Sequence, residues 1–305
     1  MINFYCVTLE TNKHIIKTNL YKLKKFYDNF SYTIITTEES CKSFSTLESN
    51  FNCNIVNEKS LISKSHFESL ILLSTSRKRG NKEIYIDKER INWYYQQVLK
   101  LSFLIDNAKI LPTTLIDADT ILLKKIPFFS KGKSIVYSTP YEKNKLYLDT
   151  SNTIFKTKVK YKYWVSCVSQ IMSLSPYEIS SLIKNLEEFK KKDEKDSTSE
   201  WIAKLIIKAV LDTHNSISGS LFSEMDLIAF FLINNLGYKP KKILFLRNEI
   251  EFMLNKNQED FVSFLGFKHV TYEDWLMKSG FYPWHKLIKK LIKYIIKFFT
   301  FRHNL

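Results

Sequence analysis

Apolar residues in this chain follow two spacings, one typical of buried strands and one typical of helices. Residues 2–8 are mostly apolar, as in a strand covered on both faces, and a helical spacing from about 12 to 29 leads to a second strand at 32–37. A strand, a helix and a second strand in this order predict an α/β fold with a mostly parallel sheet flanked by helices.

The rest of the chain continues to alternate between helical and extended patterns. Residues 51–82 are mixed, and no internal repeat or linker is found. The simplest division is one domain of residues 1–285 followed by a tail of residues 286–305. We predict helices at 88–107, 201–211 and 223–236, and strands at 114–116, 134–138, 146–157 and 242–246.

The composition indicates a folded chain that is rich in helices. Of 305 residues, 45% are hydrophobic, and there are only 6 Gly and 6 Pro, too few for a sandwich or barrel of many short strands. The 4 Cys form no Cys-x-x-Cys pair, which argues against a zinc site or a disulfide framework. Because the longest apolar run, 227–233, is far too short to span a bilayer, we expect a cytoplasmic or peripheral protein.

The net charge of +15 calls for an anionic partner, such as nucleic acid, an acidic membrane or a phosphorylated substrate. Six positive charges lie in the last twenty residues, which contain no acid, so the first 285 residues carry +9. At helical spacing, the lysines from Lys286 to Lys297 form one stripe opposite the apolar residues from Leu287 to Phe299. This pattern predicts an amphipathic helix on the anionic inner face of a membrane, and a helix docked on the core is the alternative.

Two carboxylates follow the short strand at 114–116, in the sequence Leu115-Ile-Asp117-Ala-Asp119-Thr120. In open α/β sheets, ligands bind at the carboxyl ends of the strands. Two carboxylates this close repel each other, and Mg²⁺ or Mn²⁺ resolves the repulsion by binding them together with the oxygens of a diphosphate. Asp117 and Asp119 are therefore candidate metal ligands, and a purely structural turn is the alternative.

Two other families of metal-dependent enzymes use a similar pair of aspartates. Phosphatases of the haloacid dehalogenase type have Asp-x-Asp-Gly-Thr near the start of the chain, whereas here Thr120 and Ile121 follow the pair in mid-sequence. Nucleotidyltransferases of the polymerase-β type have a Gly-Ser about a dozen residues upstream, which this chain lacks. Both classes are kept as alternatives.

Three ordered motifs resemble bacterial glycosyltransferases of the GT-A fold that build surface polysaccharides such as lipopolysaccharide and capsule. They are the Trp-x-x-Gln-Gln-x-x-Lys-Leu helix at 93–101, the strand with Asp-x-Asp at 115–120, and Phe-Ser-Glu-x-Asp at 222–226. The resemblance implies a metal-dependent hexosyltransferase-type enzyme that moves a sugar from a nucleotide-diphosphate donor to a hydroxyl of a glycan or glycolipid acceptor, with Mn²⁺ or Mg²⁺ as cofactor.

The helix at 88–107 carries polar side chains on one stripe. Trp93, Gln96, Gln97 and Lys100 share this stripe, and their amides and ammonium suit hydroxyls and a diphosphate. A partly exposed helix whose Trp packs on a loop is the alternative. We expect the opposite side to face the core through Tyr94, Tyr95, Val98, Leu101 and Ile105.

The segment from Phe222 to Asp226 has two interpretations. Ser223 is a good N-cap and Asp226 lies at the third helical position, so helix capping alone explains both residues. Alternatively, a carboxylate at the start of this helix deprotonates the acceptor hydroxyl, as an inverting displacement needs. Glu224 is the first candidate for this base and Asp226 the second.

The resemblance also implies roles for residues outside the three motifs. The strand ends near Val7, Thr8 and Thr37 would hold the base and ribose of the nucleotide, and Trp93, Gln97, Lys100 and Asp117 would contact the donor. A late histidine, His269, is a candidate third metal ligand, and a structural histidine is the alternative.

A nucleic-acid-binding module is the remaining alternative, because lysines and aromatic residues interleave between Lys156 and Trp164. No helix-turn-helix, zinc or RNA-recognition signature accompanies this tract. We therefore expect a nucleotide sugar, a glycan acceptor and a membrane surface as partners, and no nucleic acid.

Overall fold

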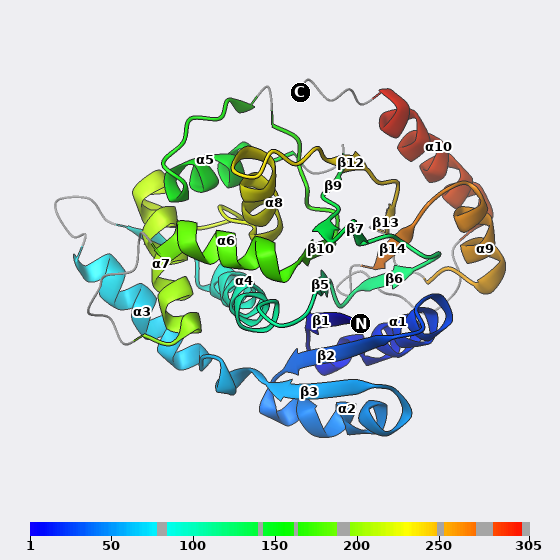
Figure 1. Ribbon diagram of the computed structural model, residues 1–305, viewed down its shortest axis with the longest axis horizontal. Helices are drawn as coiled ribbons and strands as arrows, with labels where there is room; N and C mark the ends of the chain where they lie inside the picture. Colours follow the sequence, from blue (N-terminus) through cyan, green and yellow to red (C-terminus); the bar gives the residue numbers. More distant parts are fainter. Residues whose placement is uncertain are drawn as a thin grey trace.

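The α/β fold with a mostly parallel central sheet is confirmed by the structure, a computed structural model that describes residues 1–77, 84–139, 143–161, 164–187, 196–248, 253–272 and 283–300. Five strands lie in the order β10-β5-β1-β2-β3, and only β10 runs antiparallel to its neighbour (Figure 1). Their bounds are Ile2–Val7 (β1), Phe30–Thr36 (β2), Cys53–Asn57 (β3), Thr113–Ile116 (β5) and Ile171–Leu174 (β10).

Helices cover both faces of this sheet, as the first strand illustrates. Alternate side chains of a strand point to opposite faces. Phe4 and Cys6 of β1 belong to the apolar cluster formed with α1 (Lys13–Phe26) and α2 (Glu38–Asn50). Tyr5 and Val7 belong to the cluster formed with α4 (Lys88–Asn107). A strand buried on both faces is therefore almost wholly apolar, and α1 and α4 lie on opposite sides of the strands in Figure 1.

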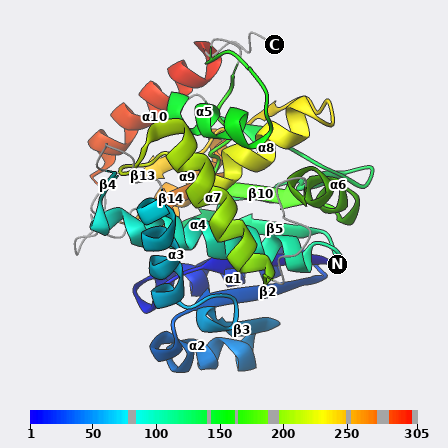
Figure 2. The same ribbon diagram turned by 90° about the vertical axis from the view of Figure 1, so that its left-hand side faces the viewer.

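The remaining elements surround this central unit, with α3, α4 and α7 side by side in Figures 1 and 2. The other α-helices are Lys64–Arg77 (α3), Lys145–Ile154 (α5), Pro176–Glu187 (α6), Thr198–His214 (α7), Glu224–Asn234 (α8), Lys256–Phe264 (α9) and Trp284–Thr300 (α10). Single 3₁₀ turns occur at Glu10–Asn12 (η1) and Glu58–Ser60 (η2). Short strands are Tyr85–Ile86 (β4), Thr120–Leu122 (β6), Phe129–Ser130 (β7), Lys133–Ser134 (β8), Tyr137–Ser138 (β9), Ser216–Ile217 (β11), Lys241–Lys242 (β12), Leu246–Asn248 (β13) and His269–Tyr272 (β14).

A second sheet begins where the central sheet ends. It has the order β13-β14-β6, and three residues separate β6 from the end of β5. The segment from Asp117 to Asp119 is thus the turn that connects the two sheets. This position fixes the two carboxylates at the carboxyl end of a central strand.

Several element predictions are confirmed and others are wrong. The helix at 88–107 has the predicted bounds, whereas residues 146–157 are mainly helix α5 and not a strand. The predicted strands at 134–138 and 242–246 are each divided between two short strands, and the mixed region contains β3 and α3.

The tail forms the predicted helix, α10, up to Thr300, and residues 301–305 lie outside the described part of the chain. Leu287, Leu291 and Tyr294 of this helix are buried in an apolar cluster with β13 and β14. None of the helices in the described ranges is long and apolar enough to cross a bilayer. The boundary at residue 285 stays a prediction.

Candidate active site

Three backbone hydrogen bonds fix the Asp117–Asp119 turn, one within the turn and two to other segments. The Asp117 amide donates to the Gln170 carbonyl (3.0 Å), and the Thr120 amide donates to the Asp117 carbonyl (3.0 Å). The Tyr272 amide donates to the Asp119 carbonyl (2.8 Å). Because these contacts use the main chain, they set the position of the turn independently of the two carboxylates.

Both aspartates line a cavity of about 660 Å³ at the carboxyl ends of β1 and β5. The size is typical of small-molecule sites, which measure about 300–1,000 Å³. Residues from eight segments, widely separated in the sequence, meet here. They include Val7, Thr8, Asn12, Arg90, Trp93, Gln96, Gln97, Lys100, Asp117, Asp119, Tyr147, Gln170, Ser223, Glu224, Arg247 and Thr271.

A buried lysine connects the turn with the start of α8. The Lys100 ammonium lies 2.6 Å from Asp117 Oδ1 and 3.1 Å from Glu224 Oε1. The backbone of Lys100 is held by the Tyr5 hydroxyl, which donates to the Lys100 carbonyl (2.8 Å). Lys100 and Glu224 are buried and Asp117 is partly buried, so this cluster has one cation between two anions.

The cluster changes the protonation behaviour of its members. Burial alone would lower the pKa of the Lys100 ammonium, but the neighbouring Asp117 and Glu224 carboxylates outweigh burial and raise that pKa. Burial raises the pKa of Glu224 above its ordinary value of 4.5, and the Asp117 charge adds to this increase while Lys100 opposes it. Lys100 is therefore charged, and Glu224 is a carboxylate with increased proton affinity.

The start of α8 positions Glu224 toward the cavity. The Ser223 hydroxyl caps the helix by accepting the Asp226 amide (3.3 Å), and Glu224 follows as the first helical residue. Its own amide donates to Gln97 Oε1 of α4 (3.4 Å). Gln97 thus supports the base candidate, a role that the sequence did not indicate.

The structure separates Asp226 from the cavity. Asp226 is fully buried and is absent from the cavity lining, and its Oδ1 accepts the Cys167 amide (2.8 Å). Both this bond and the capping of its own amide are structural contacts.

Replacing Asp226 by alanine is expected to lower the free energy of unfolding by about 1–3 kcal/mol, because the buried Cys167 amide then lacks an acceptor. Urea denaturation measures this change. Asp226→Asn retains an acceptor oxygen and should be less destabilising. Equal stability of the two variants would contradict the structural role.

Two other candidates also lie outside the cavity lining. Thr37 caps α2, where its side chain accepts the Ser40 amide. His269 is fully buried on β14 and stacks on Phe245, with 4.6 Å between the ring centres. Burial lowers the pKa of His269 to about 3, so its imidazole is neutral.

The polar stripe of α4 faces the cavity, and the opposite side of the helix is buried as predicted. Trp93 lies parallel to Tyr147, with an interplanar angle of 15° and 6.4 Å between the ring centres. Arg90 extends the polar stripe by one turn. Its position three residues before Trp93 places it on the same face of the helix, so the sequence could have identified it. Tyr147 and Arg247 have no such local signal, because only the tertiary fold brings them here.

The two aspartates fit a hard divalent cation. Carboxylate oxygens are the protein ligands of Mg²⁺ and Mn²⁺, and one or two suffice where substrate oxygens and water complete the octahedron. Within the described ranges, no group of three or more His, Cys, Asp or Glu side chains gathers around one point. The two carboxylates would leave the other positions around such a cation to water and to substrate oxygens.

Comparisons with known proteins give little sequence similarity. No protein-family model and no curated protein matches the chain. Mouse xyloside xylosyltransferase 1, apo form, is 9% identical, with 91% of this chain and 100% of that chain covered and a TM-score of 0.42. PaToxG glycosyltransferase is 14% identical, with 70% and 69% covered and a TM-score of 0.31. At these TM-scores the two structures support no functional assignment. The function proposed below is argued from the residues that line the cavity.

Proposed function

We propose that the protein is a metal-dependent glycosyltransferase of the GT-A type, which passes a sugar from a nucleotide-diphosphate donor to a hydroxyl of a glycan. One observation carries the proposal. Asp117, Asp119 and Glu224 face the same cavity at the carboxyl ends of parallel strands, although Glu224 is more than a hundred residues away. This arrangement supports the proposal, because sugar transfer from a diphosphate needs a cation and a basic carboxylate within one pocket.

The residues of the cavity divide the work of binding and proton transfer. Asp117 and Asp119 would hold Mn²⁺ or Mg²⁺, which when bound neutralises charge on the diphosphate leaving group. Val7 and Thr8 at the end of β1 would contact the nucleoside. Trp93 offers an aromatic face to a base or sugar ring.

Glu224 would accept the proton of the acceptor hydroxyl. Lys100 would act on this step as a positioning residue, because it holds the Glu224 carboxylate in its ionised form and fixes its distance from Asp117. Its ammonium is already paired with two carboxylates, so we assign it no direct contact with phosphate. The cation site and the base are thereby joined by one side chain.

The proposal is tested by incubating the protein with a panel of nucleotide sugars, with Mn²⁺ or with a chelator, and measuring release of the nucleoside diphosphate. We expect one donor to be cleaved slowly to sugar and nucleoside diphosphate, in the presence of metal only. Release of inorganic phosphate from phosphomonoesters, or of pyrophosphate from nucleoside triphosphates, would instead indicate the phosphatase or the nucleotidyltransferase alternative.

Replacing Glu224 by glutamine is expected to lower the rate of transfer to an acceptor by about 10²–10⁴-fold, as for other general bases. The donor affinity should change little, because glutamine has the same shape. In the unmodified enzyme, the rate should fall in acid as Glu224 is protonated, with a midpoint above 4.5 because burial raises its pKa. A pH profile of the transfer rate measures both effects.

The matched control is Glu259→Gln, since Glu259 is a buried glutamate that pairs with Lys22 and is absent from the cavity lining. An acid limb at the same pH and a normal rate in Glu224→Gln would eliminate Glu224 as the base.

We further propose that the acceptor is a surface glycan of the lipopolysaccharide or capsule type, carried on a lipid at the inner face of the membrane. The net charge of +15 supports this location, because an anionic lipid surface attracts a cationic protein.

A further inference from the structure

Helix α10 has three distinct faces along its length. Leu287, Leu291 and Tyr294 form the first face, which is buried against the core. The Tyr294 hydroxyl also donates to the Arg247 carbonyl (3.2 Å), so the helix is fixed in its rotation about its own axis. This docking explains only part of its apolar residues.

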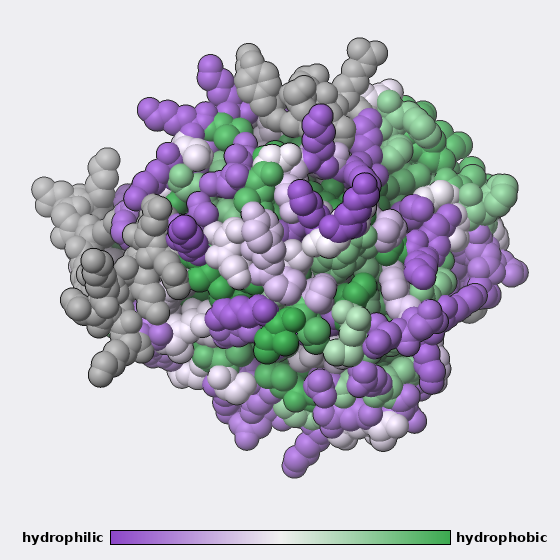
Figure 3. Space-filling view, in the orientation of Figure 1, coloured by the Kyte–Doolittle hydropathy of each residue, from purple (hydrophilic) through white to green (hydrophobic). Residues whose placement is uncertain are grey.

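The second face of α10 is apolar and exposed. It consists of Trp284, Ile288, Ile292, Ile296 and Phe299, whose exposed fractions rise from 43% at Trp284 to 74% at Phe299. The spacing of three or four residues aligns these side chains in one row. Apolar residues gather over this helix at the upper right of Figure 3, where Figure 1 shows α10.

The third face carries the lysines. Lys286, Lys289, Lys293 and Lys297 are all exposed, and they adjoin the apolar row on the side away from the core. No acidic residue occurs in the helix. Exposed apolar residues bordered by cations alone match the two parts of an anionic lipid bilayer, its acyl chains and its headgroups.

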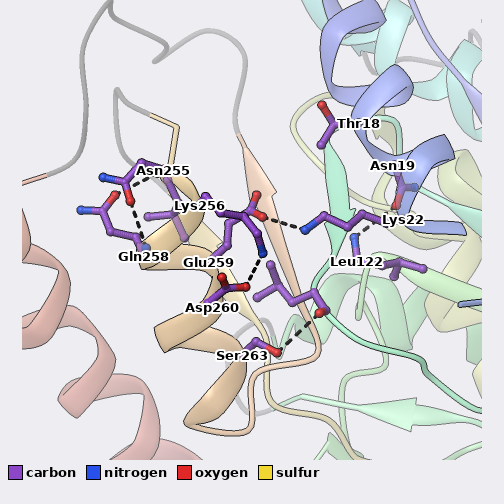
Figure 4. Close-up of polar contacts among 12 residues, drawn as sticks. Thr18, Asn19, Lys22, Leu122, Asn255, Lys256, Gln258, Glu259, Asp260 and Ser263 are labelled. Carbon is purple, nitrogen blue, oxygen red and sulfur yellow. Dashed lines mark hydrogen bonds and ion pairs between the residues drawn. The ribbon is translucent and has the colours of Figure 1, made fainter. Parts of the chain in front are cut away.

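Helix α9 extends this surface and anchors it to the body of the protein. The Phe261 ring contacts Trp284, with 5.6 Å between the ring centres, and Phe264, three residues later, is 85% exposed. Lys22 of α1 pairs with Glu259 of α9 at 2.7 Å, as Figure 4 shows. Because α9 is fixed to α1 in this way, the apolar row belongs to a rigid surface rather than to a loose tail.

We propose that the exposed apolar row of α10, together with Phe264, inserts into the outer part of an anionic lipid bilayer. The helix lies along the bilayer plane for about 25 Å, given its 17 residues. This corrects the expectation that one whole apolar face of the tail enters the membrane, since Leu287, Leu291 and Tyr294 stay on the protein. The inference deepens the proposed function. It rests on that function only where it links the membrane to a lipid-linked acceptor.

The test is cosedimentation of the full chain with vesicles of phosphatidylcholine and phosphatidylglycerol, compared with vesicles of phosphatidylcholine alone. We expect binding to the anionic vesicles. The double variant Ile292→Ser/Ile296→Ser should bind them at least about tenfold more weakly, because two exposed isoleucines no longer enter the bilayer. The charge variant Lys289→Glu/Lys293→Glu should show a comparable loss.

The matched control is Leu72→Ser/Leu73→Ser, which removes two equally exposed leucines from α3. This control should bind the vesicles like the unmodified protein. The proposal is overturned if the unmodified protein stays in solution, or if Ile292→Ser/Ile296→Ser binds as well as the control. A dimer in sedimentation that the same double variant dissociates, without vesicle binding, would identify a second copy as the occupant and also overturn it.

Measuring donor cleavage distinguishes a failure of the membrane proposal from a failure of the proposed enzyme activity. The Ile292→Ser/Ile296→Ser variant should cleave the soluble donor at the normal rate, because its side chains are absent from the cavity lining. Absence of cleavage in every protein, with normal vesicle binding, would refute the enzyme and leave the membrane surface standing.

Discussion

Replacing Asp119 by alanine is expected to lower sugar transfer about 10³-fold and to remove its dependence on Mn²⁺. A bound cation contributes several kcal/mol of charge stabilisation at a phosphate leaving group, and each 1.4 kcal/mol or so corresponds to a factor of about ten in rate. The measurement is a metal titration of transfer or donor cleavage for the variant and the unmodified protein.

The variant should fold normally, because the Tyr272 amide donates to the backbone carbonyl of residue 119 and not to its side chain. An unchanged midpoint of thermal unfolding verifies this. Asp260→Ala, which removes an exposed aspartate paired with Lys256 on α9, is the control and should remain fully active. Full activity of Asp119→Ala, with unaltered metal dependence, would refute the proposed metal site.

Replacing Lys100 by methionine is expected to lower the free energy of unfolding by about 3 kcal/mol or more. Removal of one partner from a buried ion pair leaves an uncompensated charge, and here two carboxylates, on Asp117 and Glu224, lose their shared cation. Urea denaturation measures the loss, and transfer activity should fall with it.

The loss should depend on pH in a defined direction. Without Lys100, the folded-state pKa of the Glu224 carboxyl rises further, because the ammonium that opposes the effect of burial is gone, so the folded state takes up a proton more readily. Stability of Lys100→Met relative to the unmodified protein should therefore improve as pH falls from about 8 to about 5.

A surface lysine provides the comparison. Lys204 also bridges two carboxylates, at 2.7 Å from Asp196 and 3.4 Å from Glu200, but it is more exposed. Exposed ion pairs contribute about 0–1 kcal/mol, so Lys204→Met should cost little. If the two lysine variants were equally stable, the buried cluster would have no special role.

The elements that the sequence predicted correctly are those with one strong periodicity. The helix at 88–107 begins at an N-cap, Asp87, whose side chain accepts the Glu89 amide, and its apolar residues Ile91, Tyr94, Tyr95 and Val98 repeat at helical spacing. The β1 segment is apolar except for Asn3, because both of its faces are covered. In both cases a local pattern and the tertiary environment agree.

The wrong predictions arose where propensity and local capping disagree. Residues 146–157 are rich in threonine and apolar residues that favour strands, yet Asn144 caps a helix by accepting the Leu146 amide. Thr37 follows the end of β2 as expected and caps α2, a helix start at Glu38 that the sequence analysis did not predict, and its contact with a donor stays a prediction. A short polar run after a strand was thus a helix start.

The candidate site was predictable in part. The position of Asp117 and Asp119 followed from the strand before them, and the polar stripe of α4 followed from helical spacing. The pairing of Lys100 with Glu224 did not, because it joins residues 124 positions apart in the sequence through the packing of two helices against the sheet. The exposed apolar row on α10 could not be predicted either, because the sequence does not say which apolar residues the core covers.

The central claim is that Asp117 and Asp119 hold a cation that binds a diphosphate in this cavity. The most direct measurement is the thermal unfolding midpoint of the unmodified protein and of Asp119→Ala, with a panel of nucleoside diphosphates, in Mn²⁺ and in chelator. A ligand that binds only the folded state raises this midpoint. We predict that one nucleoside diphosphate does so, only with Mn²⁺ and only with Asp119 present. Stabilisation that is equal in chelator, or equal in Asp119→Ala, would contradict the claim.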